Sequence, residues 1–202
     1  MIEKSRIIRI AYVTLFVGVL MLAACGRTPP AKFYTLQPVQ QSSPGQLLPA
    51  DVAIVVGPVA IPSAHDRQEI VTRDAGNEVS FSEYHRWAGP LQKSIASVIA
   101  QNIGTLLGTE RVTPFTRENI FRPTHRVVIN INRYDSQLPR EFLLDTTWSI
   151  KDIQGNQTLL VQGSIVREPL ASSTYEDLVA AQNQALGSLS EEIAKAFIEL
   201  IQ

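Results

Sequence analysis

The chain has 202 residues, with 18 basic, 19 acidic and one cysteine, and a formal net charge of −1. A charge this close to neutral provides no basic surface for nucleic acid, so a nucleic-acid partner is not expected. A lone cysteine has no disulfide partner and no second thiol for a metal site, and the length suits a single domain with a sizeable core.

The first 24 residues have the organisation of a secretory signal peptide. Three basic residues precede an apolar run at 10–22, and the small residues Ala23 and Ala24 then precede Cys25. This order predicts export. The alternative is an uncleaved membrane helix, but Ile10–Ala24 would extend only about 22 Å against a hydrocarbon core of about 30 Å.

The sequence Leu22-Ala23-Ala24-Cys25 resembles the lipobox of bacterial lipoproteins. The resemblance implies cleavage before Cys25, lipidation of its thiol with palmitate-type acyl chains, and acylation of the new amino terminus. Stable anchoring needs more than one acyl chain, which this processing supplies. The residue after the cysteine is Gly26 and not Asp, which in the common sorting scheme favours the outer membrane. No cofactor is expected beyond this covalent lipid.

Residues 25–50 are predicted to form a lipidated tether, because prolines recur there among Gln and Ser. The segment 33–36 (FYTL) interrupts the tether as a short predicted strand. The freely moving part would then be 26–32, at most about 25 Å long when extended. Residues 51–202 are predicted to form one periplasmic domain.

The first half of the predicted domain contains strands and one helix. Residues 51–59 are rich in β-branched side chains, and 69–73 and 78–82 flank a Gly-containing loop as in a hairpin. Residues 84–87 lead to Pro90, which suits a first helical turn, and apolar residues then recur at helical spacing for about 17 residues, ending near 104–108.

The second half predicts a three-stranded antiparallel meander from 126–134, 141–152 and 158–167. A C-terminal helix follows, and the Ser-x-x-Glu spacing of Ser173 and Glu176 predicts a capping box at its start. These elements show no regular βαβ alternation. They predict an α+β fold in which a mainly antiparallel sheet is covered by two amphipathic helices.

The sequence lacks the motifs of common catalytic sites. His65, His85 and His125 are too far apart for a metal-ligand motif, and Gly163-Ser164 lacks the second glycine of a nucleophile elbow. The sequence therefore predicts no catalytic residue, no metal and no enzymatic activity. A periplasmic hydrolase stays open as an alternative, since carboxylates distant in sequence can meet in space.

Two segments are more distinctive, namely 66–73 (DRQEIVTR) and 86–91 (RWAGPL). With the lipobox, the FYTL strand, a Trp-bearing strand at 147–150 and an Ala-rich C-terminal helix, they make the chain resemble the PqiC/YmbA family of ABC-type transport auxiliary lipoproteins. The chain departs from the family pattern at three places. Gln68 stands where a proline is usual, Ala64-His65 stands where an aromatic residue is frequent, and Gly89 stands where a glutamate could pair with an arginine at the helix entrance.

The resemblance implies an outer-membrane lipoprotein that faces the periplasm. Its partners would be inner-membrane transporter components and an MCE-domain protein that spans the periplasm as a lipid conduit. Homo-oligomeric rings that receive the conduit's tip are plausible in this family. The alternative is an envelope structural or assembly lipoprotein with no direct transport role.

Five residues are the candidates for partner binding, because Arg makes bidentate contacts with carboxylates or phosphates and both Arg and Trp are frequent at interface hot spots. They are Arg67, Arg73, Tyr84, Arg86 and Trp87. Each has a structural alternative: Trp87 could cap the core at the helix entrance, and the arginines could tie the hairpin to neighbouring loops.

Overall fold

The computed structural model describes residues 29–39, 48–49, 51–73, 77–115 and 120–201, so the predicted signal peptide and Cys25 lie outside the described residues. Contacts divide the chain into Met1–Pro30, of which only two residues are described, and Ala31–Gln202, which contains every described helix and strand. This second unit has an α+β fold with two helices and mostly antiparallel long strands, which confirms the predicted fold class.

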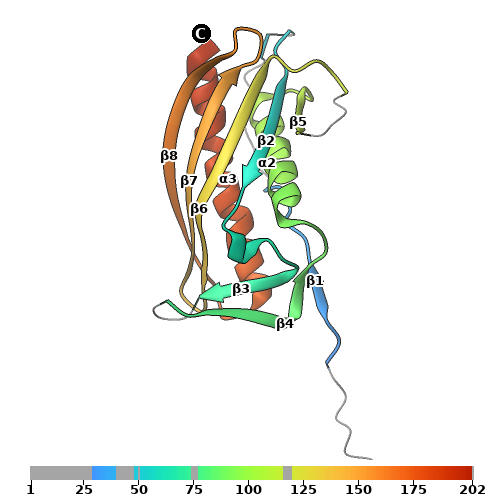
Figure 1. The fold of residues 1–202 in the computed structure, drawn as a ribbon, viewed down its shortest axis with the longest axis vertical. Coiled ribbons are helices and arrows are strands. Elements are labelled where there is room, and N and C mark those ends of the chain that lie inside the picture. Colours follow the sequence, from blue (N-terminus) through green and yellow to red (C-terminus); the bar gives the residue numbers. More distant parts are fainter. Residues whose placement is uncertain (1–28, 40–47, 50, 74–76, 116–119, 202) are drawn as a thin grey trace, which may run out of the picture. The chain divides into compact units, whose positions relative to one another are not determined.

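The larger of two sheets has five strands in the order β5-β2-β6-β7-β8 (Figure 1). Its antiparallel half is the predicted meander of β6 (His125–Gln137), β7 (Glu141–Asp152) and β8 (Gln157–Pro169). The other half is parallel: β2 (Ile54–Ala60) pairs with both β6 and β5 (Val112–Pro114). The three residues of β5 were not predicted as a strand.

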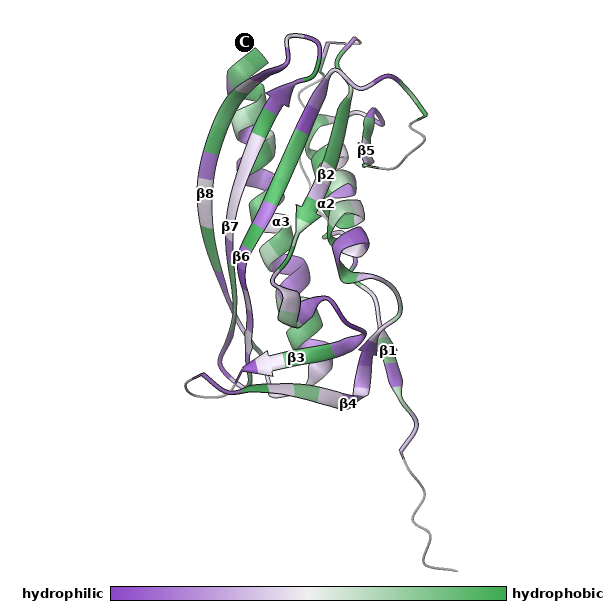
Figure 2. Cartoon of the chain, in the orientation of Figure 1, coloured by the Kyte–Doolittle hydropathy of each residue, from purple (hydrophilic) through white to green (hydrophobic). Residues whose placement is uncertain are grey.

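Two helices cover one face of this sheet, α2 (Leu91–Leu107) beside β2 and β5, and α3 (Tyr175–Ile201) beside β7 and β8 (Figure 1). Hydrophobic and hydrophilic residues alternate along the long strands (Figure 2). This alternation directs one set of side chains to the helices. In β7 the buried set consists of Phe142, Leu144, Thr146, Trp148 and Ile150.

Helix α2 has the predicted length of 17 residues. It ends where Gly108 adopts a left-handed conformation with φ of 64°, which glycine accepts without a Cβ clash. Between β2 and its parallel neighbour β5 the chain forms β3, β4 and then α2. This connection is a parallel crossover that the sequence pattern did not indicate.

The start of α3 differs from the prediction by one residue. The hydroxyl of Thr174 accepts a hydrogen bond from the Asp177 N–H at 3.2 Å and donates to the Asp177 carboxylate at 3.0 Å. The predicted capping pair Ser173 and Glu176 was therefore wrong, and the Glu176 carboxylate instead bonds the side chains of Lys32 and Tyr34. Both patterns have the same spacing, so the sequence could not distinguish them.

The smaller sheet has three strands in the order β1-β4-β3. The predicted hairpin is present as β3 (Glu69–Arg73) and β4 (Val79–Trp87), but β4 extends beyond the predicted 78–82 to include the segment assigned to the helix entrance. The third strand of this sheet is β1 (Lys32–Tyr34), which overlaps the short strand predicted at 33–36 and pairs with β4 in parallel. Residues that the sequence assigned to the tether thus form part of the sheet, and Leu36 is buried in the core.

Candidate partner-binding site

The candidate residues gather on and beside the small sheet, whose strands present charged and aromatic side chains. Phe33 of β1, Arg86 of β4 and Glu69 of β3 lie in one row across its three strands. The Arg86 guanidinium is 3.9 Å from the Glu69 carboxylate, so Glu69 supplies the partner that Gly89 cannot. The Phe33 side chain is 63% exposed beside this ion pair.

Arg67 makes a second arginine–aromatic pair on the same hairpin. It precedes β3, and its guanidinium carbon lies 3.9 Å from the centroid of the Phe81 ring on β4. This cation–π contact holds the planar guanidinium over an aromatic side chain that is 44% exposed. We call Phe33, Arg67, Glu69, Phe81 and Arg86 the hairpin surface.

The other three predicted residues have different surroundings. Arg73 at the end of β3 donates from Nε to the Asp135 carboxylate at 3.2 Å, and Arg133 donates to the same carboxylate at 2.7 Å. Trp87 is buried at 4% exposure, which supports the structural alternative for this residue. Tyr84 is half-buried on β4. The structure therefore places Arg67 and Arg86 beside aromatic residues of the small sheet and places Trp87 in the core.

Next to the hairpin surface lies an aromatic cluster that the sequence did not reveal. The His85 ring stacks on Tyr175 with centroids 3.9 Å apart, and its Nδ1 is 2.7 Å from the Tyr34 hydroxyl. The Tyr34 hydroxyl donates to the Glu176 carboxylate at 3.1 Å, and Lys32 donates to the same oxygen. Its members come from β1, β4 and α3, which lie far apart in the chain. In the sequence only Tyr34 belonged to a segment already singled out, FYTL.

Burial and charge shift the titration of this cluster. Burial and the hydrogen bond to Glu176 raise the pKa of Tyr34 to about 12, so its hydroxyl keeps its proton and remains a donor. Burial and nearby Lys32 lower the pKa of His85. The pKa of Glu176 is lowered because its carboxylate accepts hydrogen bonds from its own backbone N–H, from Lys32 and from Tyr34. At neutral pH the cluster therefore contains a neutral His85 imidazole, the two tyrosines that stack on it, and the Lys32–Glu176 ion pair.

Ser164, which follows Gly163 in the incomplete nucleophile motif, lies on β8. It accepts a hydrogen bond from the Trp148 indole of β7 at 2.9 Å and donates to the Glu192 carboxylate of α3. The first contact joins two neighbouring strands, and the second joins the sheet to the helix. Across the described ranges, no cluster of three or more His, Cys, Asp and Glu side chains could hold a metal ion. In the same part of the chain neither helix is long and apolar enough to cross a bilayer.

The fold and this surface define a class of α+β domain in which two helices cover one face of a five-stranded sheet and a small sheet adjoins it. The chain belongs to the family of ABC-type transport auxiliary lipoprotein components, whose model matches residues 34–194. The family resemblance expected from the sequence is thereby confirmed, and the protein is a lipoprotein component associated with a transporter.

Solved structures share this fold. A family DUF330 protein from Xanthomonas campestris is 16% identical with a TM-score of 0.70, and the match covers 84% of this chain and 96% of that one. An uncharacterised protein is 13% identical with a TM-score of 0.67, and the match covers 84% and 99% of the two chains. Identities this low establish a common fold alone. No curated protein matches the sequence.

Proposed function

We propose that this protein is an outer-membrane lipoprotein facing the periplasm that serves as the auxiliary subunit of an MCE-type intermembrane lipid-transport system. Membership of the transport auxiliary family supports this role, and the lipobox ending at Cys25 supports anchoring through a covalent lipid. Gly26 after that cysteine favours the outer membrane. Its role is to bind and dock the periplasm-spanning conduit, without catalysis.

The observation that carries the docking proposal is the hairpin surface. Phe33 and Phe81 expose aromatic area, and each lies beside an arginine, Arg86 and Arg67. Buried aromatic residues and arginines contribute most of the binding free energy at many protein interfaces. A conduit tip with carboxylate and apolar side chains would contact both the arginines and the exposed aromatic rings.

The position of the hairpin surface in the chain suits a protein that works at a membrane. Only seven peptide units join Cys25 to Lys32, the first residue of β1, which covalent geometry limits to about 25 Å. Since β1 is a strand of the small sheet, the lipid anchor keeps the hairpin surface close to its bilayer. A conduit that delivers or collects lipid must end at the same place.

The proposal is tested by purifying the full-length lipoprotein from outer membranes after mild crosslinking and identifying bound proteins by mass spectrometry. We expect an MCE-domain protein to co-purify, and we expect R67E and F33D each to reduce its recovery. Lys195→Glu is a charge-matched control because Lys195 is exposed on α3, an element that contributes no residue to the hairpin surface. Its recovery of the partner should equal that of the unaltered protein.

A purely structural envelope role gives a different result. The intact, abundant lipoprotein would then recover no MCE-domain protein, and its deletion would weaken the envelope without changing lipid movement. Equal losses in R67E and K195E, with both variants folded, would place the contact away from the hairpin surface while leaving the transport role in place.

We further propose that copies of this chain associate through β8. This strand is 13 residues long and lies at the edge of the large sheet, where it pairs only with β7 among the described strands. Val161 and Ile165 are 63% and 66% exposed on it. An open edge with exposed apolar side chains is a ready template for a second copy. We expect I165E to lower the oligomer mass in detergent, with L200E at an exposed position of α3 as the control.

A further inference from the structure

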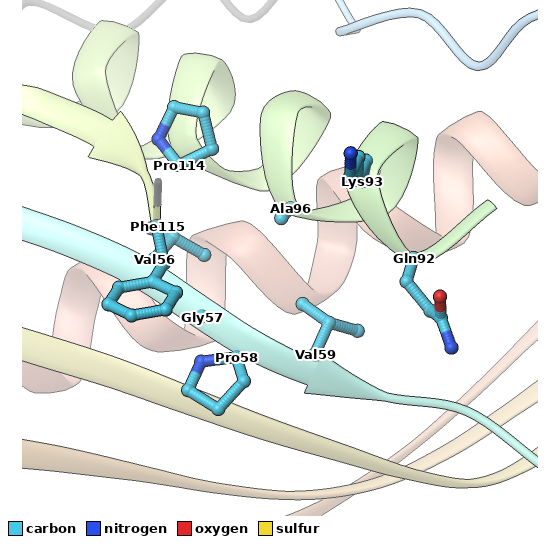
Figure 3. A pocket seen from close by; sticks show the side chains of 9 residues that line it. All are labelled: Val56, Gly57, Pro58, Val59, Gln92, Lys93, Ala96, Pro114 and Phe115. Carbon is cyan, nitrogen blue, oxygen red and sulfur yellow. The ribbon is translucent and has the colours of Figure 1, made fainter. Parts of the chain in front are cut away.

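A cavity of about 500 Å³ lies between the first half of α2 and the end of β2 (Figure 3). This volume lies within the range of small-molecule and cofactor sites. The cavity is separate from the hairpin surface, and neither the family nor the docking role assigns it a ligand. Most of its lining is apolar and consists of Val56, Pro58, Val59, Ala96, Pro114 and Phe115.

The cavity arises because β5 is short. Phe115 directly follows this strand, and its N–H donates a hydrogen bond to the Val56 carbonyl at 2.7 Å. Beyond Val56 the pairing of β2 with β6 shifts register, and β2 has no neighbour on its other side among the described strands. Ala96 of α2 points into the resulting space and fills little of it (Figure 3).

Gly57 keeps the floor of the cavity open. Its φ is +123°, a conformation that residues with a side chain rarely adopt, and an added Cβ would lie 3.0 Å from the Cβ of Phe115. Glycine is therefore required both by the backbone conformation and by the close approach of β5.

The polar lining residues lie at one end of the cavity. Gln92 and Lys93 belong to the first turn of α2, and Lys93 is exposed there. The lining contains no acidic residue, and the first turn of α2 contains none either. The site thus combines an apolar chamber with one cationic, hydrogen-bonding end.

We infer that this cavity binds one acyl chain of an anionic lipid, with the head group at Lys93. An apolar interior lined by proline, valine and phenylalanine suits a hydrocarbon chain, whose transfer from water is favourable. A lysine with no carboxylate among the described residues that line the same cavity attracts an anionic head group. The acyl chains attached to Cys25 are linked to a group with no anionic phosphate, so charge complementarity favours a separate lipid over the protein's own anchor.

The test uses the full-length lipoprotein reconstituted in phosphatidylcholine vesicles that contain a few mole per cent of a phosphatidylglycerol with a photoactivatable acyl chain. After illumination and proteolysis, mass spectrometry identifies the labelled peptides. We expect labelling of peptides that contain Val59 and Ala96. A photoactivatable phosphatidylcholine should label the same peptides about fivefold less, as one lysine near a charged lipid predicts.

Two pairs of variants separate the chamber from its charged end. Ala96→Trp fills the cavity and should abolish labelling, whereas Ala180→Trp at an exposed position of α3 should preserve it. Lys93→Glu should remove the preference for phosphatidylglycerol, whereas Lys195→Glu, exposed on α3, should preserve it. Unchanged thermal unfolding of each variant shows that folding is intact.

Three outcomes would overturn the inference: no labelling of the cavity peptides, labelling that persists in A96W, or equal labelling by the two lipids. The first is also the result expected if the Cys25 anchor fills the cavity. None of them depends on recovery of an MCE-domain partner, so failure here and failure of the proposed docking role are distinguishable.

Discussion

The two sheets of this domain are stabilised in different ways. The large sheet buries an alternating apolar face under α2 and α3, and its largest buried side chains include Trp148, Tyr134 and Phe142. The small sheet contributes Ile70 and Trp87 to the same core, and its other side chains form ion pairs, a cation–π contact and a tyrosine–histidine cluster. Most of the core therefore belongs to the large sheet and its helices, whereas the candidate recognition residues lie on the small sheet, and substitutions should divide in the same way.

The largest expected effect is in the large sheet. Trp148→Ala should lower the free energy of unfolding by about 3–5 kcal/mol, because it leaves a cavity under α3 and removes the indole that bonds Ser164. Phe33→Ala in the small sheet should change it by no more than about 0.5 kcal/mol, since surface substitutions have small effects. Urea unfolding of both variants measures the comparison. Similar losses would show that Phe33 stabilises the fold as strongly as a buried core residue does.

The second effect concerns His65, which lies between the sheets. Its ring is 8% exposed and contacts Tyr134 edge-on, with centroids 5.4 Å apart. Burial lowers its pKa to about 4, a net shift that the charge of Asp135 opposes and the charges of Arg73 and Arg67 support. The unfolded chain therefore binds a proton at higher pH than the folded chain does.

This difference sets the sign of the pH dependence. The contribution of His65 is constant above about pH 7, falls as the pH decreases toward 4, and reaches a loss of about 3 kcal/mol there. His65→Gln should flatten this part of the stability profile, measured by urea unfolding from pH 4 to 7.5. If the unaltered protein and the variant have parallel profiles, the imidazole is not neutral in the fold.

The third effect concerns two ion pairs of Asp135, one that joins β3 to β6 and one within β6. Asp135→Asn removes the charge that Arg73 and Arg133 share, and should cost about 1.5–3 kcal/mol, as for other hydrogen bonds to charged groups. Asp145→Asn on β7 is the control, because Asp145 accepts a hydrogen bond from the side-chain amide of Asn132 and forms no ion pair within 4.0 Å in the described part of the chain. Equal costs would show that the shared ion pair adds nothing specific.

The smallest effect is expected on the hairpin surface. Arg67→Ala removes the cation–π contact with Phe81 and should lower stability by about 0.5–1 kcal/mol. Recovery of a partner should fall much more than stability does. A loss of several kcal/mol in the isolated lipoprotein would assign Arg67 to the fold and not to recognition.

The sequence predicted those elements whose signal is local. Alternation along 141–152 located β7 with its observed bounds, and helical spacing predicted the 17 residues of α2. The parallel partners were not predictable from periodicity, because pairing of β1 with β4 and of β2 with β5 joins segments far apart in the chain. Arg86 and Trp87 were both candidates for partner binding from the sequence, and only the burial of Trp87 in the structure distinguishes the two.

The parallel pairing of β1 with β4 also has a mechanical consequence. Any tension between the lipid anchor and a partner held by the domain must pass through Lys32–Tyr34, because β1 is the first described strand after the anchor. Force along this strand loads its parallel hydrogen bonds in shear, so that the bonds resist together and do not open one at a time. The Tyr34 hydroxyl bonds to His85 and Glu176, and the Lys32–Glu176 ion pair adds a cross-link to α3 at the same point. The aromatic cluster thus fastens the end of the domain that would bear the load when a bound partner pulls against the lipid anchor.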